Sequence, residues 1–225
     1  MTPDPLAERL HGVQAGIEDA ARAAGRDPGE LSLIVVTKFH PASLVRRLAE
    51  LGVADVGENR HQEAQAKAAE LAGLGLRWHF VGQLQSKKAR QVRDYAHAVH
   101  SIDRPALVAA LRSEESEIDG FVQVNLTDDP ARGGVDPAGL DALVDQVLET
   151  PGIRLRGLMA VAPLGAAARP AFAAVRELSE RVQRTAPEAT ALSMGMSHDY
   201  REAIAEGATH LRIGTAITGE RPLAG

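Results

Sequence analysis

Eight short runs of apolar or mixed residues alternate with helical patterns along this chain, and this alternation limits the fold more than any other feature. The runs are LSLIVVTK (31–38), ADVGEN (54–59), RWHFVG (77–82), HAVHSI (97–102), GFVQVN (120–125), IRLRGLMAV (153–161), ATALSMG (189–195) and THLRIG (209–214). Strands that alternate with helices are typical of parallel sheets, and eight repeats predict an α/β fold, a single (β/α)8 TIM barrel. A doubly wound sheet alternates in the same way and is the alternative.

A further helical pattern precedes the first run. Its apolar positions recur at helical spacing and stop before Gly25: Leu6, Leu10, Val13, Ile17 and Ala21. Such spacing predicts an amphipathic helix. We therefore expect one barrel domain over residues 1–225, with an extra N-terminal helix.

The composition excludes several classes of protein. The formal net charge of -5 provides no overall basic field for nucleic acid or for an anionic membrane surface. The absence of cysteine rules out disulfides, a thiolate nucleophile and a cysteine-based zinc site. The sequence also lacks a signal-peptide pattern and any run of about 18 apolar residues, so we expect a soluble, cytoplasmic protein.

Polar side chains gather where the predicted strands end. They are Lys38, Glu58, Asn59, Arg60, His79, Gln83, Ser101, Asn125 and the segments 193–197 and 212–215, with Met159 at the end of the sixth run. In barrels of this kind the loops after the carboxyl ends of the strands build the active site. We therefore expect these positions to converge on one mouth of the barrel.

Two of these strand ends have the composition of an anion site. GMSHD (195–199) places Gly and Ser before a predicted helix, and RIGTAITG (212–219) places Gly214 and Thr215 similarly after the eighth run. Backbone N–H groups and hydroxyls bind anions, and the loops after strands 7 and 8 are the usual phosphate site in barrels. The alternative is that the glycines form tight turns and Ser197 caps a helix.

Lys38 ends the first run, which otherwise has the pattern of a buried strand. A lysine at a strand end is most often solvated. At a barrel mouth, however, we expect desolvation to make its neutral amine available to attack a carbonyl carbon. A phosphate site beside an activated lysine suggests pyridoxal phosphate as the cofactor.

Other motifs do not favour a different function. The glycines within 212–219 have P-loop spacing, but Glu220 and Arg221 follow them instead of the P-loop lysine and hydroxyl residue. The segments 97–100 and 198–199 contain histidine without a further ligand at a recognised metal-site spacing, so surface or capping roles are expected. The basic stretch 86–93 lacks interleaved aromatics and is expected to be a solvated helix face.

Taken together, the residues resemble the pyridoxal phosphate homeostasis protein family. The matching segments are VVTKFHP (35–41), GENRHQE (57–63), WHFVGQLQSKK (78–88), HSID (100–103), GLMAVAP (157–163), LSMGMSHDYREAI (192–204) and GATHLRIGTAITG (207–219). They follow the family order over nearly the whole chain after the first helix. The resemblance implies a single barrel similar to the N-terminal domain of alanine racemases.

The resemblance also implies a set of cofactor-binding residues. They are Lys38 as the aldimine lysine, Asn59 near the cofactor, Met194 by its ring, Arg212 at the pyridine nitrogen, and Ser197, Gly214 and Thr215 at the phosphate. The sequence departs from the family pattern at Lys87, where asparagine is usual, and at Thr218, where an aromatic residue is more usual. These departures concern the rim of the site, because neither touches the lysine or the phosphate motif.

The implied function is binding without turnover. Arg212 can only donate hydrogen bonds, so a pyridine nitrogen that faces it stays unprotonated and the ring is a poor electron sink. A racemase of this class also needs a second base opposite the lysine. Tyr95 and Tyr200 are the only tyrosines, and their predicted positions, late in one helix and at the start of another, suit neither to that role.

We therefore expect a monomeric protein that holds pyridoxal phosphate, buffers it and hands it to apo-enzymes that use it. Two alternatives stay open: an amino-acid racemase, and a barrel enzyme that acts on a sugar phosphate without pyridoxal phosphate.

Overall fold

The computed structural model describes residues 4–127 and 129–220, and these form a closed barrel of eight parallel strands. The strands are β1 (Ser32–Val36), β2 (Asp55–Glu58), β3 (Arg77–Phe80), β4 (Ala96–Ile102), β5 (Ile118–Gln123), β6 (Ile153–Met159), β7 (Ala191–Ser193) and β8 (His210–Ile213). Each strand overlaps one of the predicted runs, and β8 closes the barrel against β1. The predicted barrel is confirmed, and the doubly wound sheet is excluded.

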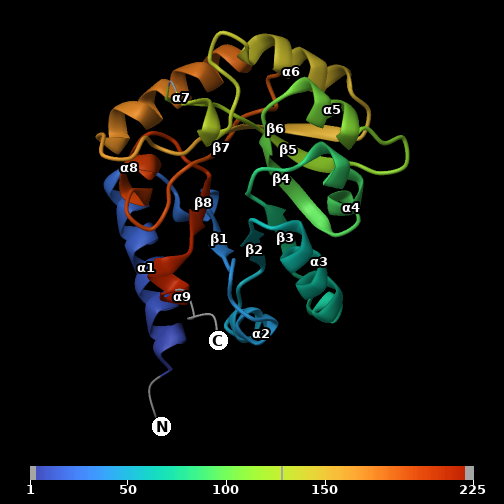
Figure 1. Ribbon diagram of the computed structural model, residues 1–225. Helices are drawn as coiled ribbons and strands as arrows, with labels where there is room; N and C mark the ends of the chain where they lie inside the picture. Colours follow the sequence, from blue (N-terminus) through green and yellow to red (C-terminus); the bar gives the residue numbers. More distant parts are fainter. Residues whose placement is uncertain (1–3, 128, 221–225) are drawn as a thin grey trace.

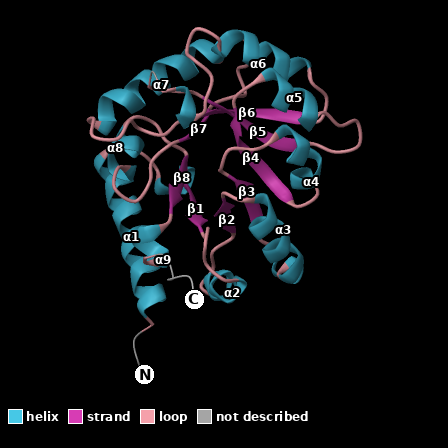
Figure 2. Ribbon diagram, viewed as in Figure 1, coloured by secondary structure: helices cyan, strands magenta, loops and turns pink. Residues whose placement is uncertain are grey.

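Helices surround the strands, as Figures 1 and 2 show. They are α1 (Pro5–Ala23), α2 (Ala42–Glu50), α3 (His61–Glu70), α4 (Ala89–Arg93), α5 (Pro105–Leu111), α6 (Leu140–Glu149), α7 (Ala168–Val182), α8 (Tyr200–Ala205) and α9 (Thr215–Thr218). Short 3-10 turns are η1 (Pro28–Glu30), η2 (Ala72–Leu74), η3 (Ser86–Lys88) and η4 (Pro130–Arg132). The basic stretch 86–93 forms η3 and α4, where Ala89 and Val92 are buried and the charged residues are exposed or half-buried.

Helix α1 precedes the barrel and packs beside α8 and α9 on its outer side (Figure 1). Asp4 caps its start, since the carboxylate accepts hydrogen bonds from the backbone N–H groups of Leu6 and Ala7. Its inner face buries Leu10 and Ile17, two of the positions that predicted the helix. The extra N-terminal helix is confirmed.

The strand register brings candidate residues to one edge of the barrel. Val35 of β1 pairs with residues of both β2 and β8. Lys38, Asn59 and Gly214 follow the ends of these three strands within two residues. They therefore lie side by side at the carboxyl edge, although they are far apart in the sequence.

The apolar residues form two separate clusters. The larger core lies between the barrel and the helices and includes Val99, Leu192 and Leu211. A small cluster lies inside the barrel: Ala98, Phe121, Met159 and Ala191. Neighbouring residues of a strand point to opposite faces of the sheet. Polar strand residues that lie next to residues of the larger core therefore point into the barrel, as the small cluster does. The barrel interior is consequently part polar.

Within residues 4–127 and 129–220, no helix has the length and apolarity needed to cross a membrane.

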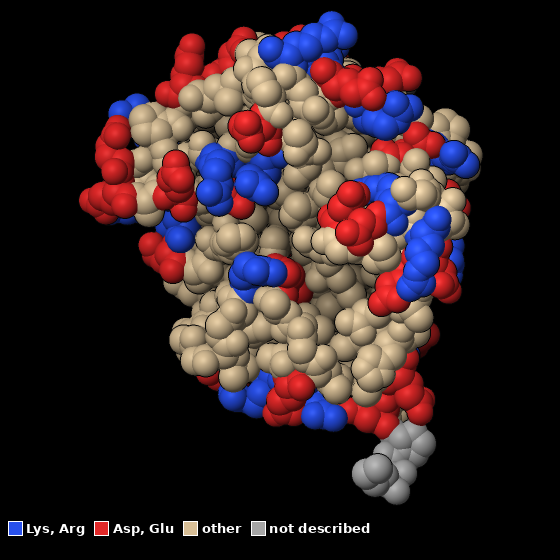
Figure 3. Space-filling model, turned by 180° about the vertical axis from the view of Figure 1, so that it is seen from behind, with Lys and Arg blue, Asp and Glu red and all other residues tan. Residues whose placement is uncertain are grey.

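Lysine and arginine are interspersed with aspartate and glutamate on the face seen in Figure 3. That face presents no extended patch of one sign.

Candidate functional site

A cavity of about 370 Å³ opens at the carboxyl edge of the barrel. Six of the seven predicted cofactor-binding residues line it: Lys38, Asn59, Ser197, Arg212, Gly214 and Thr215. Valines and methionines, among them Val36, Val81 and Met159, supply an apolar wall. The cavity lies within the volume range of small-molecule sites, roughly 300 to 1,000 Å³, and it combines apolar walls with a few polar groups, as such sites do.

Met194 differs from the other predicted residues. It is fully buried in the larger core and is not among the residues that line the cavity. Met196, two positions later, lines the cavity and is partly exposed. Gly195 between them has φ of +95°, a conformation that departs from regular strand geometry. Any methionine contact in this cavity thus comes from Met159 or Met196.

Lys38 lies at the rim of the cavity and its side chain is exposed. The desolvation expected at this position is therefore not present. The next residue, Phe39, has φ of +68°, and within the described part of the chain it is the only non-glycine residue with a positive φ. Its backbone N–H donates to Glu63 Oε2 at 3.1 Å, which helps to hold this turn. Positive φ in a bulky residue is costly and is concentrated at functional sites.

The loops after β7 and β8 meet through their hydroxyl groups. Thr215 Oγ1 donates to Ser197 Oγ at 3.3 Å, and the backbone N–H of Ala216 donates to the same oxygen at 3.3 Å. Gly214 begins this turn and leads into α9. Hydroxyls and backbone N–H groups therefore gather at one side of the cavity, in the arrangement that binds an anion.

Arg212 is buried on β8, with 5% of its surface exposed, and it is among the residues that line the cavity. Its NH1 donates to Ser193 Oγ at 2.6 Å and its NH2 donates to the Ala160 carbonyl at 2.9 Å. Burial lowers the pKa of Arg212 to about 10, which still leaves the group protonated near neutral pH. The cavity thus contains a fixed cation that can donate but not accept hydrogen bonds.

Glu58 does not join the cavity, although its strand-end position predicted that it would. Its Oε1 accepts from Thr37 Oγ1 at 2.7 Å and from Lys67 Nζ at 2.7 Å. Lys67 also donates to the Thr37 carbonyl at 2.9 Å, directly before Lys38. Burial raises the pKa of Glu58 in spite of the hydrogen bond from Lys67. This buried pair braces the end of β1 from behind the site.

The histidines also differ from the prediction. His79 was expected at the mouth and His100 at the surface, but both are buried inside the barrel, where His79 Nδ1 lies 2.9 Å from His100 Nε2. His97, in contrast, is exposed. The segment 97–100 therefore has one outer and one interior histidine, because β4 continues through both positions.

Other residues predicted to converge at the mouth lie elsewhere. Ser101 is fully buried on β4, and Asn125 uses its side-chain oxygen in a local turn with Thr127. Gln83 lines a neighbouring cavity of about 300 Å³ that shares Asn59 with the first. Neither Tyr95 nor Tyr200 is among the residues that line the main cavity.

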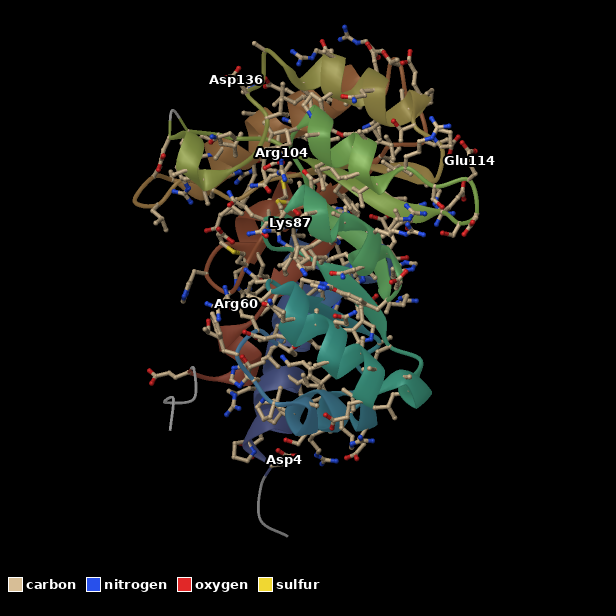
Figure 4. All side chains as sticks on the ribbon, turned by 45° about the vertical axis from the view of Figure 1, so that its right-hand side comes forward. Asp4, Arg60, Lys87, Arg104, Glu114 and Asp136 are labelled. Carbon is tan, nitrogen blue, oxygen red and sulfur yellow. The ribbon has the colours of Figure 1, made fainter. Side chains whose placement is uncertain are left out.

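The two departures from the family pattern have different surroundings. Lys87 is exposed, and in Figure 4 it lies between Arg104 and Arg60 on one side of the barrel. Thr218 is buried in α9, where its hydroxyl donates to the Gly214 carbonyl at 3.2 Å. Thr218 therefore contacts the predicted phosphate motif, contrary to the expectation that it would not, and supports the turn at Gly214.

Comparisons with known proteins agree with this geometry. The model of the alanine racemase N-terminal domain family matches residues 14–222. A pyridoxal phosphate homeostasis protein from Pseudomonas aeruginosa is 43% identical over 222 residues, 96% of this chain and 96% of that protein.

Solved structures extend the comparison. The structure of PipY from Synechococcus elongatus with pyridoxal phosphate bound is similar with a TM-score of 0.85 and 38% identity, over 95% of this chain and 100% of that one. Alanine racemase from Corynebacterium glutamicum has the same fold with a TM-score of 0.74 at 17% identity, over 99% of this chain and 62% of that one. The chain belongs to the alanine racemase N-terminal domain family, and within it to the pyridoxal phosphate homeostasis proteins.

Proposed function

We propose that this protein binds pyridoxal phosphate in the cavity at the carboxyl edge of the barrel, retains it through Lys38, and takes part in cofactor homeostasis. The observation that carries the proposal is the set of groups in one cavity: an amine, a hydroxyl and N–H cluster, and a guanidinium. These groups match an aldehyde, a phosphate and a pyridine nitrogen. The relatives that are named for pyridoxal phosphate support the same assignment.

Each of these residues has a distinct role in the proposal. When bound, the cofactor would supply an aldehyde carbon, and the amine of Lys38 would hold it by a covalent bond formed with loss of one water. Ser197 and Thr215, with the N–H groups at the start of α9, would hold the phosphate. Arg212 would donate a hydrogen bond to the ring nitrogen. Asn59, directly after β2, would face the cofactor, and Met159 and Met196 would take the place by the ring that the resemblance gave to Met194.

An absorbance titration tests this function. The purified protein is mixed with increasing pyridoxal phosphate, and the spectrum and the equilibrium affinity are recorded. We expect a saturable visible band with one equivalent bound, which makes the protein yellow. A protein that stays colourless and binds sugar phosphates would instead favour the barrel enzyme without pyridoxal phosphate.

We infer that the bound cofactor is held without turnover. Arg212 keeps the ring nitrogen unprotonated and so limits the withdrawal of electrons from a bound amino acid. Neither tyrosine lines the cavity to act as a second base. Deuterium exchange at Cα of L- and D-amino acids in D2O tests this point. Rapid exchange with loss of optical purity would favour a racemase.

The remaining parts of the proposal concern the whole protein. We infer one cofactor-binding domain over residues 1–225, a monomeric state, a cytoplasmic location, and delivery of the cofactor to apo-enzymes. Sedimentation tests the monomer. Activation of an apo-enzyme by the loaded protein, compared with an equal concentration of the free cofactor, tests delivery.

A further inference from the structure

A chain of five polar side chains crosses the interior of the barrel. Asp55 Oδ1 lies 2.9 Å from His79 Nε2, His79 Nδ1 lies 2.9 Å from His100 Nε2, and His100 Nδ1 lies 2.7 Å from Ser193 Oγ. Arg212 NH1 completes the chain at 2.6 Å from the same oxygen. The five residues come from β2, β3, β4, β7 and β8, and all are buried. The chain begins at the first residue of β2 and ends at the cavity.

The two ends of the chain fix the direction of its hydrogen bonds. Arg212 can only donate. Burial by itself would raise the pKa of Asp55, but hydrogen bonds from Arg77 and His79 outweigh it and hold that pKa well below its usual value. Asp55 is therefore a carboxylate and can only accept. Every hydrogen in between must point from Arg212 toward Asp55.

This direction assigns the proton on each ring. Burial lowers the pKa of His100 well below its usual value, so the ring is neutral and carries one N–H. Ser193 accepts from Arg212 and donates to His100 Nδ1, which leaves the proton of His100 on Nε2 to reach His79. His79 then accepts at Nδ1 and donates from Nε2 to Asp55. Each donor and each acceptor has one partner.

If the hydrogen bonds between Ser193 and His79 ran in the opposite direction, the ring of His79 would need a second proton, because it would donate to both His100 and Asp55. His100 would then donate to Ser193, whose oxygen would accept twice and whose own hydrogen would lose its acceptor. Asp55 already has a counter-charge, because Arg77 Nε donates to it at 2.7 Å and NH2 at 2.5 Å. A charged His79 is thus not needed to balance the carboxylate.

The surroundings hold the middle of the chain in place. The ring of His100 stacks on Phe121, with centroids 4.3 Å apart and planes at 13°. Buried polar groups are costly unless all are satisfied, and apolar residues of similar volume often stabilise such a core equally well. Packing alone therefore does not explain two histidines and a serine at these positions.

We propose that His79, His100 and Ser193 are positioning residues that orient Arg212 as a hydrogen-bond donor toward the ring of the cofactor. The proposal rests on the proposed function, because Arg212 would act on a pyridine nitrogen in the cavity. Ser193 and the Ala160 carbonyl fix NH1 and NH2, so the guanidinium plane is set before any ligand enters. Preorganised donors bind more tightly than donors that must be ordered on binding.

Nuclear magnetic resonance of the unliganded protein tests the chain without the cofactor. Long-range ¹H–¹⁵N correlation spectra of ¹⁵N-histidine protein report which ring nitrogen carries the proton. We expect both His79 and His100 as the Nε2–H tautomer. A proton on Nδ1 of His100 would contradict the direction of the hydrogen bonds from Arg212 to Asp55. It would overturn the proposal whether or not the protein binds pyridoxal phosphate.

Substitutions at position 100 test the action on the cofactor. His100→Leu breaks the chain, whereas His100→Gln keeps an acceptor and a donor. His97→Leu is the matched control, because His97 lies on the same strand, is exposed, and contacts the ring of His79 at 5.7 Å between centroids without taking part in the hydrogen bonds. We expect His100→Leu to weaken the affinity for pyridoxal phosphate about tenfold, the size of one lost hydrogen bond to a charged group, and His100→Gln to restore most of it.

The pyridine nitrogen itself provides the decisive signal. With ¹⁵N-pyridoxal phosphate, we expect the shift of an unprotonated ring nitrogen in the wild type and in His97→Leu, and a shift toward the protonated value in His100→Leu. Equal shifts and affinities in the wild type, His97→Leu and His100→Leu overturn the proposal. If His100→Leu does not fold, Ser193→Ala takes its place. This smaller change removes the hydroxyl that joins Arg212 to His100, and the same affinity and nitrogen shift are measured. If the wild type does not bind pyridoxal phosphate, the proposed function is contradicted instead. The tautomers measured in the unliganded protein still test the direction of the hydrogen bonds.

Discussion

The mouth of this barrel and the buried parts of the protein, inside the barrel and beneath α3, contain the same kinds of side chain in different environments. At the mouth, Lys38 is exposed and the Ser197 hydroxyl is shared among weak contacts of 3.3 Å. Behind it, Lys67 is buried and bonded to both Glu58 and a backbone carbonyl. The polar groups at the mouth are available to a ligand, whereas most of those in the interior bond to one another; the exceptions among the described residues are Glu58 Oε2 and Ser101 Oγ, which are buried without a hydrogen-bond partner. Substitutions at the mouth should therefore reduce binding, and substitutions in the interior should reduce stability.

The largest effect is expected for Lys38→Ala. This change removes the amine that retains the cofactor, so covalent capture of pyridoxal phosphate should be lost completely. The free energy of unfolding should change by less than about 0.5 kcal/mol, as for other exposed positions. Intact-protein mass after borohydride reduction measures the capture, and urea unfolding measures the stability. A large loss of stability here would erase the contrast between mouth and interior.

The next effect concerns the buried lysine. Lys67→Met should destabilise the protein by about 3 to 5 kcal/mol, because it leaves Glu58 buried without its partner. Lys38→Met is the matched control, with the same substitution at the exposed lysine. The double variant Lys67→Met with Glu58→Gln should recover part of the loss. Urea unfolding of the four proteins, wild type included, checks this, and equal losses for the two single variants would refute it.

A smaller effect is expected at the anion loops. Ser197→Ala combined with Thr215→Ala should weaken the affinity for pyridoxal phosphate about a hundredfold, about tenfold for each of two lost hydrogen bonds to a charged group. Thr185→Ala is a control at an exposed threonine outside the cavity. Equilibrium titration measures the affinity and thermal unfolding the stability. Unchanged affinity in the double variant would remove both residues from the phosphate site.

The smallest effect is a pH dependence in the interior. Folding lowers the pKa of Asp55 below its usual 3.8, so its contribution to stability is complete above that value and is lost as the pH falls toward the folded pKa. Between pH 6 and pH 3 this loss should be on the order of 1 kcal/mol. Urea unfolding of the wild type and of Asp55→Asn at the two pH values measures it. The difference between the two proteins should narrow at pH 3, and a constant difference would contradict the shifted pKa.

The sequence predicts the barrel well because alternation of strands and helices is a local pattern. It also predicts most of the site, since residues after the ends of neighbouring parallel strands must meet at one edge. Lys38, Arg212 and Thr215 line the cavity for this reason.

The direction of a side chain is harder to predict than its position along a strand. Gly195 interrupts β-strand alternation, so the exchange of Met194 for Met196 at the cavity could not be read from spacing. A register shift in β4 between Val99 and Ile102 likewise obscures which residues face inward. The interior position of His100, and with it the polar chain, depends on contacts among five strands and has no local signal.

Mapping of the captured cofactor tests the central claim most directly. The sequence has four lysines, Lys38, Lys67, Lys87 and Lys88, so every lysine that captures the cofactor can be assigned by peptide mass and fragmentation. The protein is mixed with one equivalent of pyridoxal phosphate, reduced with borohydride, digested and analysed by mass spectrometry. We predict that the adduct lies on Lys38 and that the exposed Lys87 stays unmodified. An adduct spread over Lys87 and Lys88, or absent from Lys38, would contradict the assignment of the site.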